Sequence, residues 1–328
     1  MRPNRFQEID WLRAVGILII ILIHATAYYK DNPVARNLWN FSQFAVQTFV
    51  FCSAYIFWHK EAQSGDFRFL PYFTKRLKRL VLPYYWYLLG FIPLMYLSKP
   101  KQVGLNYILQ QLTLTTANLD LNWFVLLFLY FALLLPFIAY LYQQKRQLFY
   151  LFGLFSLAGS LFFMTHHLAL NYKLTMWLPW SLIIIFALYF VKWEKTKIFA
   201  ISGFFIACFL FLLARFWLQI NGHSLVFFDN KYPPNFYFLV YGIFVTIILF
   251  YLARLGIFKM FFFQRSVHFL STNSYSLFFI HFLLIFASGN FFNLKIFTWW
   301  QFFALILIST IVVQLTLSRL KNHLFSTL

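Results

Sequence analysis

The sequence predicts an all-α integral membrane protein: a bundle of about ten transmembrane helices with both termini in the cytoplasm. Of its 328 residues, 62% are hydrophobic and only 11% are charged, and the mean hydropathy is +0.71. A soluble globule with this composition would have to expose large apolar patches. We therefore exclude a soluble enzyme, a disordered chain and a secreted disulfide scaffold. The two cysteines, Cys52 and Cys208, lie in apolar stretches and provide no disulfide framework.

Apolar runs about as long as a bilayer is thick predict the individual spans. Pro83 and Pro93 make the third run the weakest, although proline is tolerated where neighbouring helices satisfy the freed carbonyls. No linker or internal repeat divides the chain, so we expect one integral membrane domain over residues 1–328 and no separate soluble domain. The runs cover residues 11–29, 40–58, 80–97, 123–142, 148–165, 174–191, 198–218, 236–253, 270–288 and 296–318.

The basic residues gather on one side of this topology. With a cytoplasmic N-terminus, most Lys and Arg residues fall in the inner segments, most densely in the stretch 75–79. This asymmetry follows the positive-inside rule and predicts attraction to anionic membrane lipid. The topology therefore accounts for the net charge of +19, and no nucleic-acid partner is expected. We predict a multi-pass protein of the plasma (inner) membrane.

The first predicted span carries two ionisable residues on one helix face. Arg13 and His24 are eleven residues apart, which is about three turns plus 20°, and about 16 Å along the axis. Asp10 precedes Arg13 by three residues and can pair with it. Ionisable groups inside a membrane are costly and tend to mark function. The structural alternatives are an arginine that sets topology and a histidine that bonds to a neighbouring helix.

Five motifs follow one another along the chain, and together they resemble those of the acyltransferase-3 family of multi-span membrane O-acyltransferases. They are EIDWLRAVGILIIILIHA (8–25), FVFCSAYIF (49–57), RLKRLVLPYYWY (76–87), LNWFVLLFLYFALLLP (121–136) and STNSYSLFFIHFLLI (271–285). One departure is Ala54, where the family commonly has glycine. The resemblance implies transfer of an acyl group, in the first instance acetyl, from cytoplasmic acyl-CoA to a hydroxyl of a cell-envelope glycan. Acyl-CoA would be a co-substrate, with no bound cofactor.

The resemblance also implies roles for individual residues. His24 would be the general base, because a neutral imidazole can remove the proton of a sugar hydroxyl near working pH. Arg13, on the same helix face, would be the second catalytic candidate and would hold the donor. Guanidinium and ammonium groups bind phosphate oxygens, so the donor-binding candidates on the cytoplasmic side are Lys75, Arg76, Lys78 and Arg79. The alternative for this cluster is a juxtamembrane group that sets topology and contacts anionic lipid.

Further pocket candidates are Asp10, Trp123, Tyr275 and His281. The structural alternatives are helix–helix hydrogen bonds for Tyr275 and His281, and the interfacial aromatic belt for Trp123. No metal site is predicted. A second hypothesis is an exporter or flippase of a polysaccharide or lipid-linked sugar, in which the same polar residues line a passage. The acyl group, the acceptor glycan and the oligomeric state stay open at this point.

Overall fold

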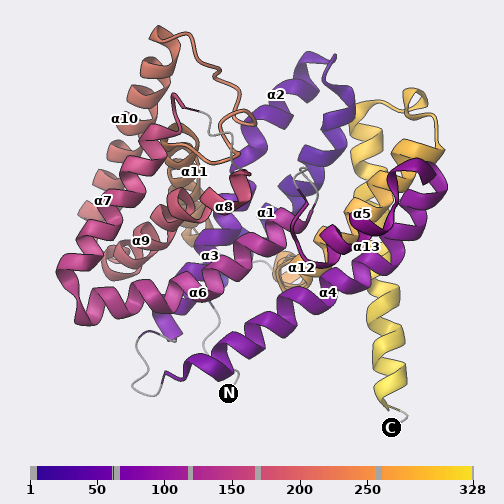
Figure 1. Cartoon of the computed structure of the whole chain (residues 1–328), viewed down its shortest axis with the longest axis horizontal. Helices are drawn as coiled ribbons and strands as arrows, with labels where there is room; N and C mark the ends of the chain where they lie inside the picture. The colour runs from indigo at the N-terminus through magenta and orange to yellow at the C-terminus, as the bar shows by residue number, and fades with distance from the viewer. Residues whose placement is uncertain are drawn as a thin grey trace. The chain divides into compact units, whose positions relative to one another are not determined.

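The computed structural model describes residues 6–60, 62, 67–116, 121–166, 171–255 and 261–326, and they fold almost entirely into α-helices (Figure 1). Within these ranges there is no β-strand, only an isolated bridge between Lys231 and Pro234. The helices are α1 (Gln7–Thr26), α2 (Pro33–Phe41), α3 (Ala45–Lys60), α4 (Phe69–Ser98), α5 (Leu105–Leu112), α6 (Asn122–Gln144), α7 (Arg146–Phe162), α8 (Tyr172–Thr175), α9 (Trp177–Trp193), α10 (Lys197–Ile220), α11 (Phe236–Arg254), α12 (Phe261–Phe291) and α13 (Trp299–Ser326).

Eight helical segments in the described residues are long and apolar enough to cross a membrane, so the chain is a multi-pass membrane protein. The expected third span is one of them, since α4 continues through both Pro83 and Pro93. The eight are Gln7–Tyr29, Phe69–Ser98, Asn122–Gln144, Tyr172–Trp193, Lys197–Ile220, Phe236–Arg254, Phe263–Phe291 and Trp299–Leu320.

Two of the ten expected spans are shorter than the sequence suggests. The run 40–58 is not one helix, because a 3₁₀ turn at Ser42–Phe44 separates α2 from α3, which has 16 residues. The run 148–165 lies on α7, which has 17 residues and ends at Phe162. Both fall just short of the roughly 20 residues that span a bilayer without tilt or thinning. The count of ten and the cytoplasmic termini therefore remain predictions.

The chain forms two compact units, and each unit is assembled from separate stretches of sequence. We call them the terminal unit (Met1–Gln43, Pro83–Thr115 and Gly256–Leu328) and the central unit (Phe44–Leu82 and Thr116–Leu255). In the terminal unit α1 packs against α12, α13 and α2. In the central unit α3 packs against α9 and α11, α10 against α11, and α7 against α9. Helix α4 begins in the central unit and ends in the terminal unit.

A close approach between α3 and α11 organises the core of the central unit. Gln47 Nε2 donates a hydrogen bond to the carbonyl oxygen of Phe238 at 2.6 Å. The amide side chain of Gln47 lies directly over Gly242, where an added Cβ would overlap Gln47 Oε1. Only glycine therefore permits this approach, and it lets a buried polar side chain satisfy a backbone carbonyl between two helices.

Candidate functional site

The terminal unit brings His24 and His281 together, although 257 residues separate them in the sequence. His24 lies in the last turn of α1, and its Nδ1 is 2.9 Å from Nε2 of His281 on α12. The ring centroids are 5.1 Å apart and the ring planes differ by 23°. Because the two nitrogens are much closer than the centroids, the rings meet edge to edge, as an in-plane hydrogen bond requires.

The hydrogen-bond network assigns the tautomers of this pair. His281 Nδ1 is 3.0 Å from the carbonyl oxygen of Leu277, which can only accept, so this nitrogen carries a proton. Nε2 of a neutral His281 is then an acceptor, and His24 Nδ1 must donate to it. His24 Nε2 is consequently the nitrogen with the lone pair. The inferred chain of donors runs from His24 through His281 to a backbone carbonyl.

Phenylalanine rings surround the pair and keep it in an apolar environment. Phe282 meets the His24 ring edge-on at 5.3 Å, and Phe278 lies 5.6 Å from the His281 ring. His281 is completely buried, whereas His24 is partly exposed. A buried charge without hydrogen-bond compensation is costly, so this shell favours the neutral forms from which the tautomers follow. Of the two imidazoles, His24 is the more exposed.

A second polar contact joins the same two helices at the other end of the predicted catalytic face. Ser271 Oγ donates to Asp10 Oδ1 at 2.6 Å. Asp10 and His24 on α1 thus face Ser271 and His281 in the same order on α12, so the two helices run parallel. Arg13 lies one turn from Asp10 on α1 and is half-buried. Its expected pairing with Asp10 stays a prediction.

Tyr275, another pocket candidate, belongs to an aromatic cluster of the terminal unit. Its ring meets Phe279 edge-on at 5.0 Å, and Phe279 also contacts Tyr84 and Tyr87 of α4. Tyr84 donates to the backbone carbonyl of Gln111 at 2.9 Å. This packing is what the structural alternative for Tyr275 would produce, and its expected place in a substrate pocket stays a prediction.

The four basic donor-binding candidates lie on the first turns of α4, in the central unit, and the structure distinguishes one of them. Arg76 is half-buried, and its Nη1 donates to Ser53 Oγ on α3 at 3.1 Å. Its guanidinium also lies over the Tyr72 ring, 5.4 Å from the centroid. The three exposed members are Lys75, Lys78 and Arg79. A half-buried, oriented guanidinium is better suited than an exposed side chain to bidentate binding of phosphate.

Trp123, the second residue of α6, is buried in the central unit against the loop that precedes α11. Its ring meets Tyr232 edge-on at 5.1 Å, and Lys231 Nζ lies 5.4 Å from its centroid. Burial lowers the pKa of Lys231 from 10.5 to about 7. A second buried lysine, Lys173, donates to Asn122 Oδ1 at 2.6 Å and to Thr116 Oγ1 at 3.0 Å. Whether Trp123 contacts substrate stays a prediction.

Comparison with protein families decides the class of the protein. The model of the acyltransferase-3 family, described as an acyltransferase domain, matches residues 6–319. The chain belongs to the acyltransferase-3 family. Comparisons with curated proteins and with solved structures give no match. As a member of the acyltransferase-3 family the chain is a membrane acyltransferase, and the predicted family is confirmed.

The acyltransferase-3 motifs form two pairs in the structure. The first motif meets the last one through His24 with His281 and Asp10 with Ser271, in the terminal unit. The second motif meets the basic motif through Ser53 and Arg76, in the central unit. Ala54, the departure from the family pattern, is the neighbour of Ser53 and is buried.

One buried charged residue, Glu194, was not predicted from the sequence. Glu194, at the end of α9, is buried; its Oε2 accepts from the Tyr55 hydroxyl at 2.9 Å and its Oε1 is 3.3 Å from Arg254 Nη2. Arg254 Nη1 also donates to the Glu194 carbonyl oxygen at 3.0 Å. Glu194 thus ties α9 to α3 and α11. Its position three residues after the end of the apolar run 174–191 was the only signal in the sequence. Within the described residues no three His, Cys, Asp or Glu side chains form a group that could hold a metal ion.

Proposed function

We propose that the protein is an O-acyltransferase of the plasma membrane that moves an acyl group, acetyl in the first instance, from acyl-CoA to a hydroxyl of a cell-envelope glycan. The observation that carries this proposal is the hydrogen bond between His24 Nδ1 and His281 Nε2. It orients the His24 ring and leaves Nε2 as the basic nitrogen. A base held in one orientation and one tautomer is what transfer to an alcohol needs.

In the proposed reaction, His24 Nε2 takes the proton of the acceptor hydroxyl as the oxygen attacks the thioester carbonyl carbon. The resulting imidazolium donates through Nδ1 to His281 Nε2, which spreads its charge without requiring a carboxylate. Collapse of the tetrahedral intermediate breaks the C–S bond. The proton on Nε2 then passes to the departing CoA sulfur, so the base returns to its neutral form and the products are an ester and a thiol.

The proposed donor-binding residues are the basic cluster of α4 and Arg13. Arg76 is the strongest candidate for the CoA phosphates, because Ser53 and Tyr72 already hold its guanidinium. Arg13 shares a helix face with His24, about 16 Å away along the axis, which suits a contact with the pantetheine arm or the thioester. By the predicted topology, the thioester would come from the cytoplasm and the alcohol from the outer side of the membrane.

The reaction is tested with purified protein in lipid nanodiscs, radiolabelled acetyl-CoA and surface glycan prepared from cells that lack the gene. Label transferred to the glycan, recovered as acetate after mild alkaline hydrolysis of the ester, supports the proposal. Mass spectrometry of the glycan with and without the gene then identifies the modified hydroxyl. Absence of CoA binding together with glycan movement across vesicles would instead establish the exporter hypothesis.

A further inference from the structure

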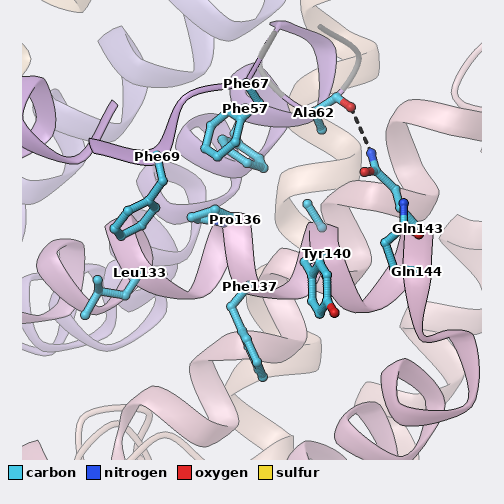
Figure 2. A pocket seen from close by; sticks show the side chains of 11 residues that line it. Phe57, Ala62, Phe67, Phe69, Leu133, Pro136, Phe137, Tyr140, Gln143 and Gln144 are labelled. Carbon is cyan, nitrogen blue, oxygen red and sulfur yellow. Dashed lines mark hydrogen bonds between the residues drawn. The ribbon is translucent and has the colours of Figure 1, made fainter. Parts of the chain in front are cut away.

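A cavity of about 570 Å³ in the central unit lies outside the catalytic candidates (Figure 2). Phe57, Phe67 and Phe69 form one wall, and the side chains along the last turns of α6 form the other. Its volume falls within the range of about 300–1,000 Å³ that is typical of small-molecule sites. Apart from two glutamines at one end, its side chains are almost entirely apolar, so it suits a ligand with a hydrocarbon body.

The wall formed by α6 has a gradient of polarity along its length. The lining residues on this helix run from Leu133 to Gln144, eleven residues or about 16 Å, which is half of a hydrocarbon core about 30 Å thick. Leu133 and Phe137 occupy the apolar end, while Gln143 and Gln144 occupy the other (Figure 2). Gln143 Nε2 donates to the Ala62 carbonyl at 2.9 Å and joins the two walls there. The cavity therefore matches an amphiphile one leaflet long.

Positive charge gathers at the polar end of this cavity. Lys145 and Arg146 follow Gln144 directly and are exposed, and the Arg146 guanidinium lies over the Tyr142 ring, 5.2 Å from its centroid. In the stretch 60–68 the two basic residues, Lys60 and Arg68, are balanced by Glu61 and Asp66, which lie outside the described residues. The excess of positive charge therefore comes from Lys145 and Arg146. A headgroup at this end would therefore meet a net positive field, which attracts anionic lipid.

We propose that this cavity is a binding site for one anionic glycerophospholipid, with an acyl chain along Leu133 and Phe137 and the phosphate near Lys145 and Arg146. The charge pattern predicts that this end of α6 is cytoplasmic, so the lipid would come from the inner leaflet. A glycan's many hydroxyl groups would find few hydrogen-bond partners here, because the only polar side chains in the lining are Tyr140, Gln143 and Gln144. The site does not depend on the proposed catalytic function.

The test is native mass spectrometry of the full chain released from nanodiscs that contain equal amounts of phosphatidylglycerol and phosphatidylcholine. The wild type is expected to retain one phosphatidylglycerol per chain. Leu133→Trp fills the apolar end and should lower the retained lipid about tenfold, which corresponds to the loss of about two buried methylene groups. The matched control is Leu212→Trp on α10: Leu212 is 54% exposed and Leu133 46%, but Leu212 does not line the cavity.

A second pair of variants tests whether the basic residues at the polar end of the cavity select anionic lipid. Lys145→Gln with Arg146→Gln should lower the preference for phosphatidylglycerol over phosphatidylcholine by about fivefold per charge removed. Lys195→Gln with Lys197→Gln changes two exposed basic residues, one just before α10 and one at its first position, and should leave this preference unchanged. Equal retention of both lipids by the wild type overturns the proposal, and so does unchanged retention by a Leu133→Trp variant whose thermal unfolding is normal. Retention of an acyl-CoA or of a second chain instead of lipid also overturns it.

Discussion

His24 and His281 form a hydrogen bond of 2.9 Å between Nδ1 of one ring and Nε2 of the other. The orienting partner of the proposed base is therefore a neutral imidazole, which is itself anchored by the Leu277 carbonyl. In the soluble Ser-His-Asp arrangement this partner is a carboxylate. An imidazole achieves the same orientation without an anion that would have to be desolvated among apolar helices.

Replacement of His281 should separate its orienting role from simple packing. His281→Leu removes the acceptor for His24 Nδ1, so we expect kcat for acyl transfer to fall about 100-fold with little change in KM for acyl-CoA. His281→Gln places an amide oxygen near the former Nε2 and should recover much of this loss. The measurement is steady-state transfer kinetics of both variants, with thermal unfolding as the check on folding. Equal activity of the two variants would show that His281 only fills space.

The burial of Lys231 predicts a specific pH dependence of the free energy of unfolding. Burial lowers its folded-state pKa to about 7, whereas the unfolded chain titrates near 10.5, so between these values the unfolded state binds more protons. Wild-type stability should therefore rise with pH across this window, by up to about 1.4 kcal/mol per pH unit. Lys231→Met should be more stable than the wild type at pH 7, and the difference should shrink by pH 9.5. Denaturation of both proteins in detergent across this range measures the difference, and a gap independent of pH contradicts the account.

The contact between Glu194 and Arg254 should show energetic coupling in a double-mutant cycle. Glu194→Gln leaves Arg254 without its ionic partner, and we expect a loss of about 2 kcal/mol, reduced from that of a fully buried pair because the Arg254 side chain is 30% exposed. Arg254→Gln should cost a similar amount. The double variant should then lose clearly less than the sum of the two losses. Additive losses would mean that the two side chains do not stabilise each other.

Substitution of Gly242 tests whether the close approach of α3 and α11 stabilises the fold. In Gly242→Ala the new Cβ displaces Gln47 and breaks its bond to the Phe238 carbonyl, so we expect a destabilisation of about 2–3 kcal/mol. Adding Gln47→Ala should recover part of this loss because it removes the clash. Gly203→Ala on α10 is the matched control: its Cβ would meet nothing within 4 Å, so it should be neutral or slightly stabilising. Thermal unfolding of the four proteins gives the comparison.

The composition and the apolar runs were sufficient to predict a helical membrane protein, because the lengths of such helices follow from bilayer thickness. They did not show that the run 40–58 breaks at Ser42–Phe44, since two polar residues, Ser42 and Gln43, are too short an interruption to end an apolar run. The shared face of Arg13 and His24 followed from helical periodicity alone. The partner of His24 did not, because its contact with His281 depends on the tertiary packing of α1 against α12. Glu194 was missed for the same reason: burial and partners, not residue type, make it a structural centre.

The most direct test of the central claim is the rate of acetyl transfer from labelled acetyl-CoA to glycan by purified His24→Ala, compared with the wild type. The matched control is His268→Ala, which removes an exposed histidine from α12. We predict that His24→Ala lowers the rate by about 10²–10⁴-fold while CoA binding and thermal unfolding stay unchanged. His268→Ala should retain wild-type activity. Transfer by His24→Ala at the wild-type rate would show that His24 is not the base.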